Sequence, residues 1–189
     1  MTWLAVSTAG QLVVILALAF VVISLARQIG VLHERTAPAS LDRKVTMLAV
    51  GEVFPRLEVP TLAGGQISLG GEQTSWLALL FVAADCPICR SVLPAYVDCL
   101  DHTGNIHGLW VGDGLQVAGY DGYARENGLD PAAFVVSQEL GLLLGIRALP
   151  AIAVLDADST LVAQQVLNGP RQLGRVFDQL AIPNGENAT

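Results

Sequence analysis

The residues best suited to chemistry in this chain of 189 amino acids form the motif Cys86-Pro87-Ile88-Cys89. The motif follows a continuous apolar run, 76–83, that predicts a buried strand, and it opens a stretch to about Leu100 that predicts a helix. At the start of a helix, free main-chain N–H groups and the helix dipole favour a thiolate. Cys89, three residues further on, can form a disulfide with Cys86. The pair can therefore attack a substrate disulfide and resolve the mixed disulfide, or run in reverse.

Three alternatives to redox chemistry exist for the two cysteines. A zinc ribbon needs a second C-x-x-C, which the sequence lacks. Cys99 and His102 could complete a set of four ligands by sequence spacing, but a helix would place Cys99 roughly 15 Å from Cys89, too far to share an ion. Haem attachment needs a histidine where Arg90 stands. A chance pair of buried cysteines is the remaining alternative. The position of the motif between a strand and a helix favours redox chemistry of the two cysteines, and no metal is expected.

These residues resemble those of a known fold family. Leu80–Arg90, with Pro94 beyond it, is similar to the active-site strand and kinked helix of the thioredoxin fold, and 145–151 is similar to the loop that carries its cis-proline. The resemblance implies that Cys86 is the nucleophile and Cys89 the resolving thiol. It implies that the Leu149–Pro150 bond is cis, that both residues bind an extended substrate, and that the redox-active Cys86–Cys89 disulfide replaces any cofactor.

The rest of the chain from residue 49 predicts the elements of an α/β domain. A short hairpin is expected at 58–59 and 66–69, strands at 76–83, 108–111, 133–136, 151–155 and 161–166, and helices at 86–100, 117–127, 138–144 and 170–180. Alternating strands and helices followed by a hairpin and a last helix predict a thioredoxin-like three-layer α/β/α domain over 49–189. Its opening hairpin and the strand and helix inserted after the motif resemble membrane-anchored thioredoxins and the peroxiredoxin-like superfamily.

The sequence also departs from those families near the motif. Asp85 stands where many thioredoxins have tryptophan, and its carboxylate opposes a thiolate on Cys86, an effect that Arg90 offsets in part. Leu80 replaces the buried acid of thioredoxins, so that proton relay is absent. Ala83 replaces the threonine that a peroxiredoxin needs, which argues against peroxidase activity. Cys99 is interpreted as a buried helix residue.

Composition indicates a membrane segment at the start. The chain is 52% apolar but only 14% charged, which excludes a disordered protein, and its net charge of −7 with one lysine excludes nucleic acid as a partner. No charged residue occurs in 1–26, and the apolar run 4–25 would span roughly 33 Å as a helix, enough to cross a bilayer. A cleaved signal peptide or a buried core helix fits less well, since the segment has neither a basic start nor an A-x-A site.

Residues 27–48 are expected to be a juxtamembrane segment and linker. Residues 26–35 and 37–39 resemble the juxtamembrane segment of the methylamine utilization MauD family, and the order of anchor, linker and motif is the same. The resemblance implies a single-pass inner-membrane protein with its domain in the periplasm. The segment 27–44 that follows the anchor carries a net charge of +2, which argues weakly for a domain in the cytoplasm.

The family resemblance implies partners as well as a location. The implied protein substrate is the disulfide-rich small (beta) subunit of methylamine dehydrogenase, whose maturation the domain would assist, with a membrane redox partner such as MauE and the lipid bilayer itself. Two alternatives remain open at this point. One is a reductant for cytochrome c maturation, and the other is a non-catalytic factor that holds a subunit for assembly.

Overall fold

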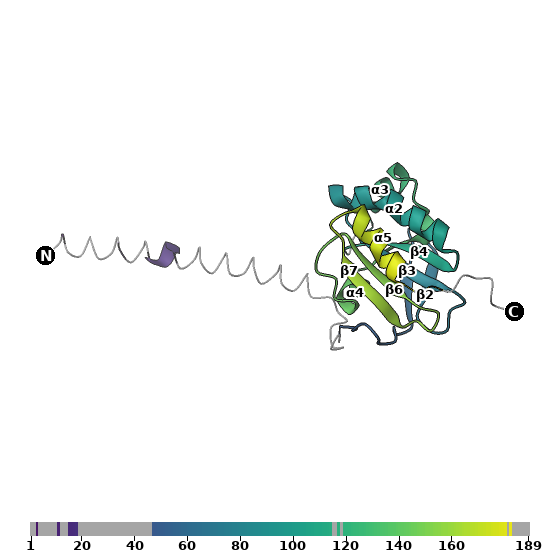
Figure 1. Cartoon of the computed structure of the whole chain (residues 1–189). Helices are drawn as coiled ribbons and strands as arrows, with labels where there is room; N and C mark the ends of the chain where they lie inside the picture. The colour runs from purple at the N-terminus through teal and green to yellow at the C-terminus, as the bar shows by residue number, and fades with distance from the viewer. Residues whose placement is uncertain are drawn as a thin grey trace. The chain divides into compact units, whose positions relative to one another are not determined.

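The computed structural model of the chain (Figure 1) describes residues 3, 11, 15–18, 47–114, 117, 119–180 and 182. The chain divides into two compact units, 1–45 and 46–189. The membrane segment predicted at 1–26 and the linker predicted at 27–48 fall mostly outside the described residues. Within the described residues, no helix has the length and apolar character that a bilayer crossing requires.

The second unit contains two sheets and a set of helices. The strands are β1 (Leu57–Pro60), β2 (Gln66–Leu69), β3 (Trp76–Val82), β4 (Ile106–Gly112), β5 (Phe134–Val136), β6 (Ala151–Leu155) and β7 (Leu161–Val166). The helices are α2 (Pro87–Thr103), α3 (Tyr120–Glu126), the 3₁₀ turn η1 (Pro131–Ala133), α4 (Gln138–Leu143) and α5 (Pro170–Gln179). The thioredoxin-like α/β fold predicted for this part of the chain is thereby confirmed.

The larger sheet places the motif at the end of its central strand. Its five strands run in the order β5-β4-β3-β6-β7, with β5, β4 and β3 parallel and β6 and β7 antiparallel to their neighbours. β1 and β2 form a separate antiparallel hairpin. β3 is buried along most of its length because both sides of the sheet are covered, which explains its uninterrupted apolar sequence.

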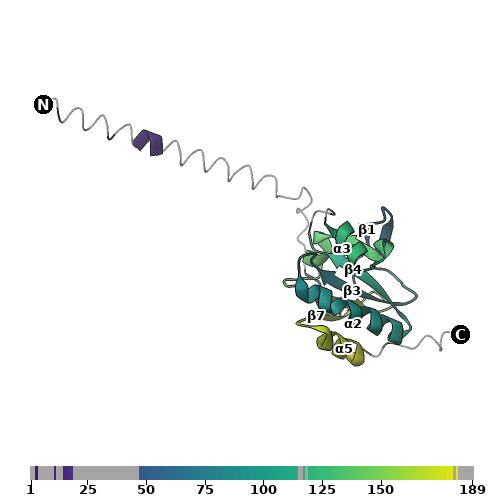
Figure 2. The same cartoon turned by 90° about the horizontal axis from the view of Figure 1, so that it is seen from above.

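Alternation along β3 divides the core into two layers. Ala78, Leu80 and Val82 pack into a cluster with α2, α3 and α5, whereas Leu79 and Phe81 pack into a cluster with α4 and the hairpin. This is the period of two that a strand imposes on its side chains. Figure 2 shows α2 and α5 together against one face of the sheet. The domain is therefore a three-layer structure with the motif on the side of α2, α3 and α5.

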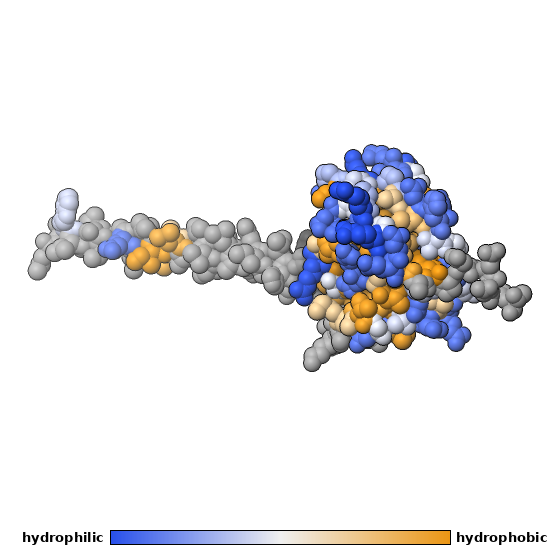
Figure 3. Space-filling view, in the orientation of Figure 1, coloured by the Kyte–Doolittle hydropathy of each residue, from blue (hydrophilic) through white to orange (hydrophobic). Residues whose placement is uncertain are grey.

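The surface of the domain is uneven in polarity. In Figure 3 the upper part of the domain is mainly hydrophilic, whereas apolar surface gathers over the lower part, where β7 and α4 lie in Figure 1. Exposed apolar side chains of these two elements include Val166 and Leu142.

Element bounds agree with the predictions more closely for strands than for helices. β6 and β7 match the expected ranges, and α2 continues three residues beyond Leu100. α3 is shorter than the expected 117–127 because it begins at Tyr120, after Gly119 with a φ of 107° that lies outside the helical region.

Candidate active site

The motif lies where β3 gives way to α2. Cys86 is the N-cap residue of α2, and its sulfur accepts a hydrogen bond from the main-chain N–H of Cys89 at 3.2 Å. Pro87 occupies the first helical turn, where an N–H would have no partner within the helix. The Cys86 N–H itself donates to the Ala83 carbonyl at 3.2 Å, which closes the turn after β3. The sequence expectation that Cys86 sits at a helix N-terminus is confirmed.

The two sulfur atoms differ in access to solvent. Cys89 is fully buried, with 0% of its surface exposed, whereas Cys86 is half-buried. Ile88, between them in sequence, is 47% exposed and adds an apolar side chain to the surface beside Cys86. Only Cys86 can therefore meet a second protein directly.

The Cys89 thiol is held in its protonated form. Burial and, after it, the hydrogen bond with the Cys86 side chain raise the pKa of Cys89 to about 12, while a hydrogen bond with the Ala83 main chain acts in the opposite direction. Both cysteines are free thiols in the structure, so it represents the dithiol form. A buried, protonated Cys89 behind an N-capping Cys86 leaves the first attack to Cys86.

The proline loop meets the motif at one edge of the sheet. The Leu149–Pro150 peptide bond is cis, as the sequence resemblance implies. Phe81 pairs with Ala151, so the end of β3 that leads to Cys86 lies opposite the residue that follows Pro150. The Pro150 carbonyl accepts a hydrogen bond from Leu167 N–H at 2.8 Å, which ties the loop to the chain beyond β7.

Leu149 links the loop to the core while its neighbours face solvent. Its side chain packs against the core clusters on both faces of the sheet, whereas Arg147 and Ala148 are exposed. Among the described residues, the N–H of Leu149 bonds to no other main-chain group. The domain's own main chain therefore does not occupy this N–H.

Charged side chains surround the first turn of α2. Arg90 forms an ion pair with Glu126 of α3 at 3.9 Å and lies 3.5 Å from the Ala84 carbonyl. Both side chains of this pair are well exposed, so the pair contributes little to stability. Asp85 is exposed next to Cys86. The ion pair does show that the end of α3 reaches the start of α2.

Two tyrosines of α3 lie in the same core cluster as Cys89, and the sequence pattern assigns them no role there. Tyr120 and Tyr123 are 6% and 3% exposed, and their rings pack edge to face with 6.3 Å between centroids. The Tyr120 hydroxyl donates to the carbonyls of Val82 at 3.2 Å and Asp113 at 2.8 Å. The i, i+3 spacing of two aromatics on an expected helix was the available signal, and it indicates only a shared helix face.

Metal binding finds no support in this part of the molecule. Within 47–114, 117, 119–180 and 182, no group of three His, Cys, Asp or Glu side chains is placed to hold an ion. Cys99 lies on α2, where burial and the nearby Asp178 and Asp98 raise the pKa of its thiol.

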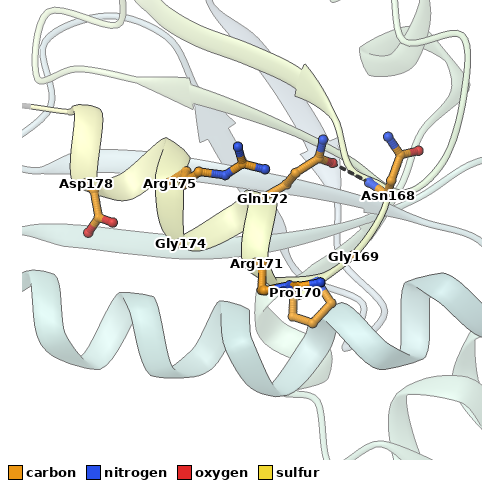
Figure 4. A pocket seen from close by; sticks show the side chains of 8 residues that line it. All are labelled: Asn168, Gly169, Pro170, Arg171, Gln172, Gly174, Arg175 and Asp178. Carbon is orange, nitrogen blue, oxygen red and sulfur yellow. Dashed lines mark hydrogen bonds between the residues drawn. The ribbon is translucent and has the colours of Figure 1, made fainter.

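A surface groove along α5 is separate from the dithiol. Figure 4 shows its lining, in which the main-chain N–H of Asn168 donates to the Gln172 side-chain oxygen at 2.6 Å. Neither cysteine of the motif nor Pro150 lines this groove. The lining residues are Asn168, Gly169, Pro170, Arg171, Gln172, Gly174, Arg175 and Asp178.

Comparison with solved structures supports the fold. The chain superimposes on a putative thiol:disulfide interchange protein DsbE from Chlorobium tepidum with a TM-score of 0.60 and 17% identity, covering 70% of this chain and 95% of the other. It also superimposes on a putative protein disulfide isomerase from Bacteroides thetaiotaomicron with a TM-score of 0.59 and 16% identity, covering 70% and 87%. At such identities the likeness concerns the fold alone.

Comparison of sequences identifies the family. No protein-family model matches the chain. It is 31% identical over 169 residues to a methylamine utilization protein MauD of Methylophilus methylotrophus, covering 87% of this chain and 78% of that protein. A second MauD, from Methylobacillus flagellatus, is 29% identical over 165 residues, covering 86% and 80%. The chain therefore belongs to the MauD family of methylamine utilization proteins.

Proposed function

We propose that this protein is a thiol–disulfide oxidoreductase in which Cys86 is the nucleophile and Cys89 the resolving thiol. The observation that carries the proposal is the placement of the Cys86 sulfur at the N-cap of α2, 3.2 Å from the Cys89 N–H. The cis Leu149–Pro150 bond at the same edge of the sheet supports it, because that loop can offer main-chain groups to a substrate at the half-buried Cys86 sulfur.

The reaction is an exchange of disulfides that needs no other cofactor. The Cys86 thiolate attacks one sulfur of a substrate disulfide, forming a mixed disulfide and releasing the other sulfur as a thiolate. Cys89 loses its proton to solvent and attacks Cys86, which forms the Cys86–Cys89 disulfide and releases the second substrate thiol. Two electrons pass from the dithiol to the substrate, and the reverse sequence oxidises a substrate dithiol. An isomerase would use the first attack alone.

The proposed substrate is the small (beta) subunit of methylamine dehydrogenase. The family name of the relatives places them in methylamine utilization, and a disulfide-rich subunit is a target that an exchange enzyme of that pathway can serve. A membrane redox partner such as MauE would restore the state of the Cys86–Cys89 pair after each cycle.

The proposed location is the inner membrane, with 1–26 as a single-pass anchor, 27–48 as juxtamembrane segment and linker, and 49–189 in the periplasm. The uncharged, apolar sequence of 1–26 and the oxidising environment that protein disulfides require support this arrangement. Alkaline phosphatase fused after residue 189 is expected to be active, since that enzyme folds only after export. An inactive fusion that is present in full amount would place the domain in the cytoplasm.

A trapping experiment tests the function and the substrate together. In cells that express the dehydrogenase subunits, Cys89→Ser is expected to leave Cys86 joined to its substrate, because the sulfur that would resolve the mixed disulfide is gone. Non-reducing electrophoresis and mass spectrometry should recover the small subunit. The matched control, Cys86→Ser, should trap nothing.

Two results would contradict the proposal. Recovery of cytochrome apoproteins instead of the dehydrogenase subunit would favour a reductant of cytochrome c maturation. Full rescue of a deletion strain by the Cys86→Ser/Cys89→Ser double variant would favour a non-catalytic assembly factor.

A further inference from the structure

Tyr123 carries a buried hydroxyl that the proposed reaction does not yet use. Its side chain is 3% exposed, and its oxygen has no hydrogen-bond partner among the described residues. The neighbouring Tyr120 differs, because its hydroxyl donates to two main-chain carbonyls. Tyr123 is therefore an unpaired donor inside the core.

Three observations connect the segment of Tyr123 with the elements that hold the dithiol. It belongs to the same core cluster as Cys89, against which the half-buried Cys86 also packs. One helix turn before it, Tyr120 is bonded to Val82 at the end of β3, and one turn after it, Glu126 pairs with Arg90 in the first turn of α2. The segment of α3 that carries Tyr123 is thus tied on both sides to the elements that hold the motif.

The electrostatics of Tyr123 agree with this position. Burial first, and then the charges of Cys89, Cys86 and Tyr120, raise the pKa of Tyr123 to about 12, while the charge of Arg90 lowers it. The charged and titratable groups that act on the hydroxyl are therefore those of the motif, its flanking arginine and the adjacent tyrosine. Tyr123 therefore keeps its proton in the neutral range and can donate it in a hydrogen bond.

An unpaired buried hydroxyl costs stability, since it loses its hydrogen bonds to water without replacement. Phenylalanine would fill the same space and pack against Phe134 without that cost. The other unpaired buried group among the described residues, the Trp110 indole N–H, belongs to a ring that has no apolar counterpart of equal size. The hydroxyl of Tyr123 is therefore a feature that packing alone does not explain.

We propose that the Tyr123 hydroxyl is a positioning group for the resolving thiol, and that it donates a hydrogen bond to the Cys89 sulfur when that sulfur becomes a thiolate. The inference rests on the proposed function. During resolution the Cys89 proton leaves to solvent, the thiolate attacks the Cys86 sulfur, and the electron pair of the mixed disulfide leaves with the substrate thiol. Tyr123 keeps its proton throughout and lowers the cost of the buried negative charge.

Stopped-flow kinetics with an aromatic disulfide separates the two steps. In the full chain carrying Cys99→Ala, dithiobis(nitrobenzoic acid) releases one coloured thiol on attack by Cys86 and a second on attack by Cys89. Tyr123→Phe is expected to leave the first release unchanged and to slow the second about tenfold, the value of a hydrogen bond to a charged group. In Tyr123→Phe the pH midpoint of the second phase should rise, because the Cys89 thiolate loses the hydrogen bond that stabilises it.

Two further variants give the comparison its specificity. Fluorotyrosine at position 123 retains a donor hydroxyl and is expected to keep the rate of the second phase. Trp110→Phe removes the other unpaired buried donor and is expected to leave both phases unchanged. Thermal unfolding of Tyr123→Phe should show stability equal to or above that of the parent, since an unpaired group is removed.

The outcomes distinguish this inference from the function on which it rests. If the second release is as fast in Tyr123→Phe as in the parent, or if Trp110→Phe slows it as much as Tyr123→Phe does, the role of the hydroxyl is overturned. The dithiol chemistry would remain intact in either case. Absence of the second release in the parent would instead overturn the proposed function, and the role of Tyr123 with it.

Discussion

The hydroxyl of Tyr120 lies 3.2 Å from the carbonyl oxygen of Val82, the last residue of β3. The same carbonyl accepts the Asp113 N–H at 3.1 Å, and the same hydroxyl donates to the Asp113 carbonyl at 2.8 Å. One side chain of α3 thereby joins the ends of two neighbouring parallel strands. The turn that carries Cys86 departs from this junction.

Tyr120→Phe is expected to weaken the junction without removing packing. Loss of the hydroxyl leaves the Asp113 carbonyl without this donor and costs about 1–2 kcal/mol of unfolding free energy. Urea denaturation of the dithiol form measures this quantity. Unchanged stability would mean that water replaces the hydroxyl at no cost.

Gly112→Ala is expected to displace the Tyr120 ring. A Cβ at Gly112 would lie 2.8 Å from two atoms of that ring, and such overpacking costs about 1–3 kcal/mol. Gly122→Ala on α3 is the matched control, because a Cβ there meets nothing within 4 Å and helix propensity favours alanine. Combining Gly112→Ala with Tyr120→Phe should cost less than the sum of the two, since both disturb the same hydrogen bonds.

Alkaline pH is expected to destabilise the dithiol form through Cys89. Folding raises the pKa of this thiol from its ordinary value of 9.0 to about 12, so the stabilising effect is complete below the lower value and is lost as pH rises toward the higher one. The unfolded chain releases the proton first, which lowers the unfolding free energy by at most about 1.4 kcal/mol per pH unit.

Denaturant titrations under a phosphine reductant test this slope. Both proteins carry Cys99→Ala, and one of them also carries Cys89→Ser, whose hydroxyl does not ionise in this pH range. The unfolding free energy should fall less between the two pKa values in the Cys89→Ser protein than in the parent. Tyr96, Tyr120 and Tyr123 remain in both, and burial raises the pKa of each. Identical slopes in the two proteins would contradict a protonated Cys89.

Cys99→Ala is expected to leave disulfide exchange unchanged. The thiol is partly buried on α2, and its pKa is raised by burial and by Asp178 and Asp98, so few molecules carry a thiolate at neutral pH. Exchange rates with the aromatic disulfide, measured beside those of Cys86→Ala, provide the comparison. A slower Cys99→Ala would reveal a third redox thiol.

Sequence reasoning succeeds where short-range pattern determines structure. β6 is predicted to the residue because an apolar run is bounded by Pro150 and the turn at Asp156, and the motif is placed at a helix start because a buried strand precedes it. The family resemblance rests on the same local signals, including the cis bond before Pro150.

The contacts that α3 makes near the motif could not be predicted from local sequence patterns. Tyr120 lies 38 residues from Val82 in sequence, and nothing in 117–127 states which face of the sheet the helix covers. The early start expected for α3 was wrong because Gly119, rather than Val117, precedes its first turn. The buried hydroxyl of Tyr123 depends on this tertiary packing and has no counterpart in a sequence pattern.

The unequal burial of the two sulfurs determines where every covalent intermediate must form. Of the two, Cys86 is half-buried and Cys89 fully buried, so under the proposed function a partner protein becomes joined to the motif at the Cys86 sulfur. Escape from a stalled intermediate can then be internal, because the Cys89 sulfur is already within the domain and its attack requires no thiol from outside. Under the proposed function, a client can therefore be released at a rate that the domain itself sets, even where few thiols surround it.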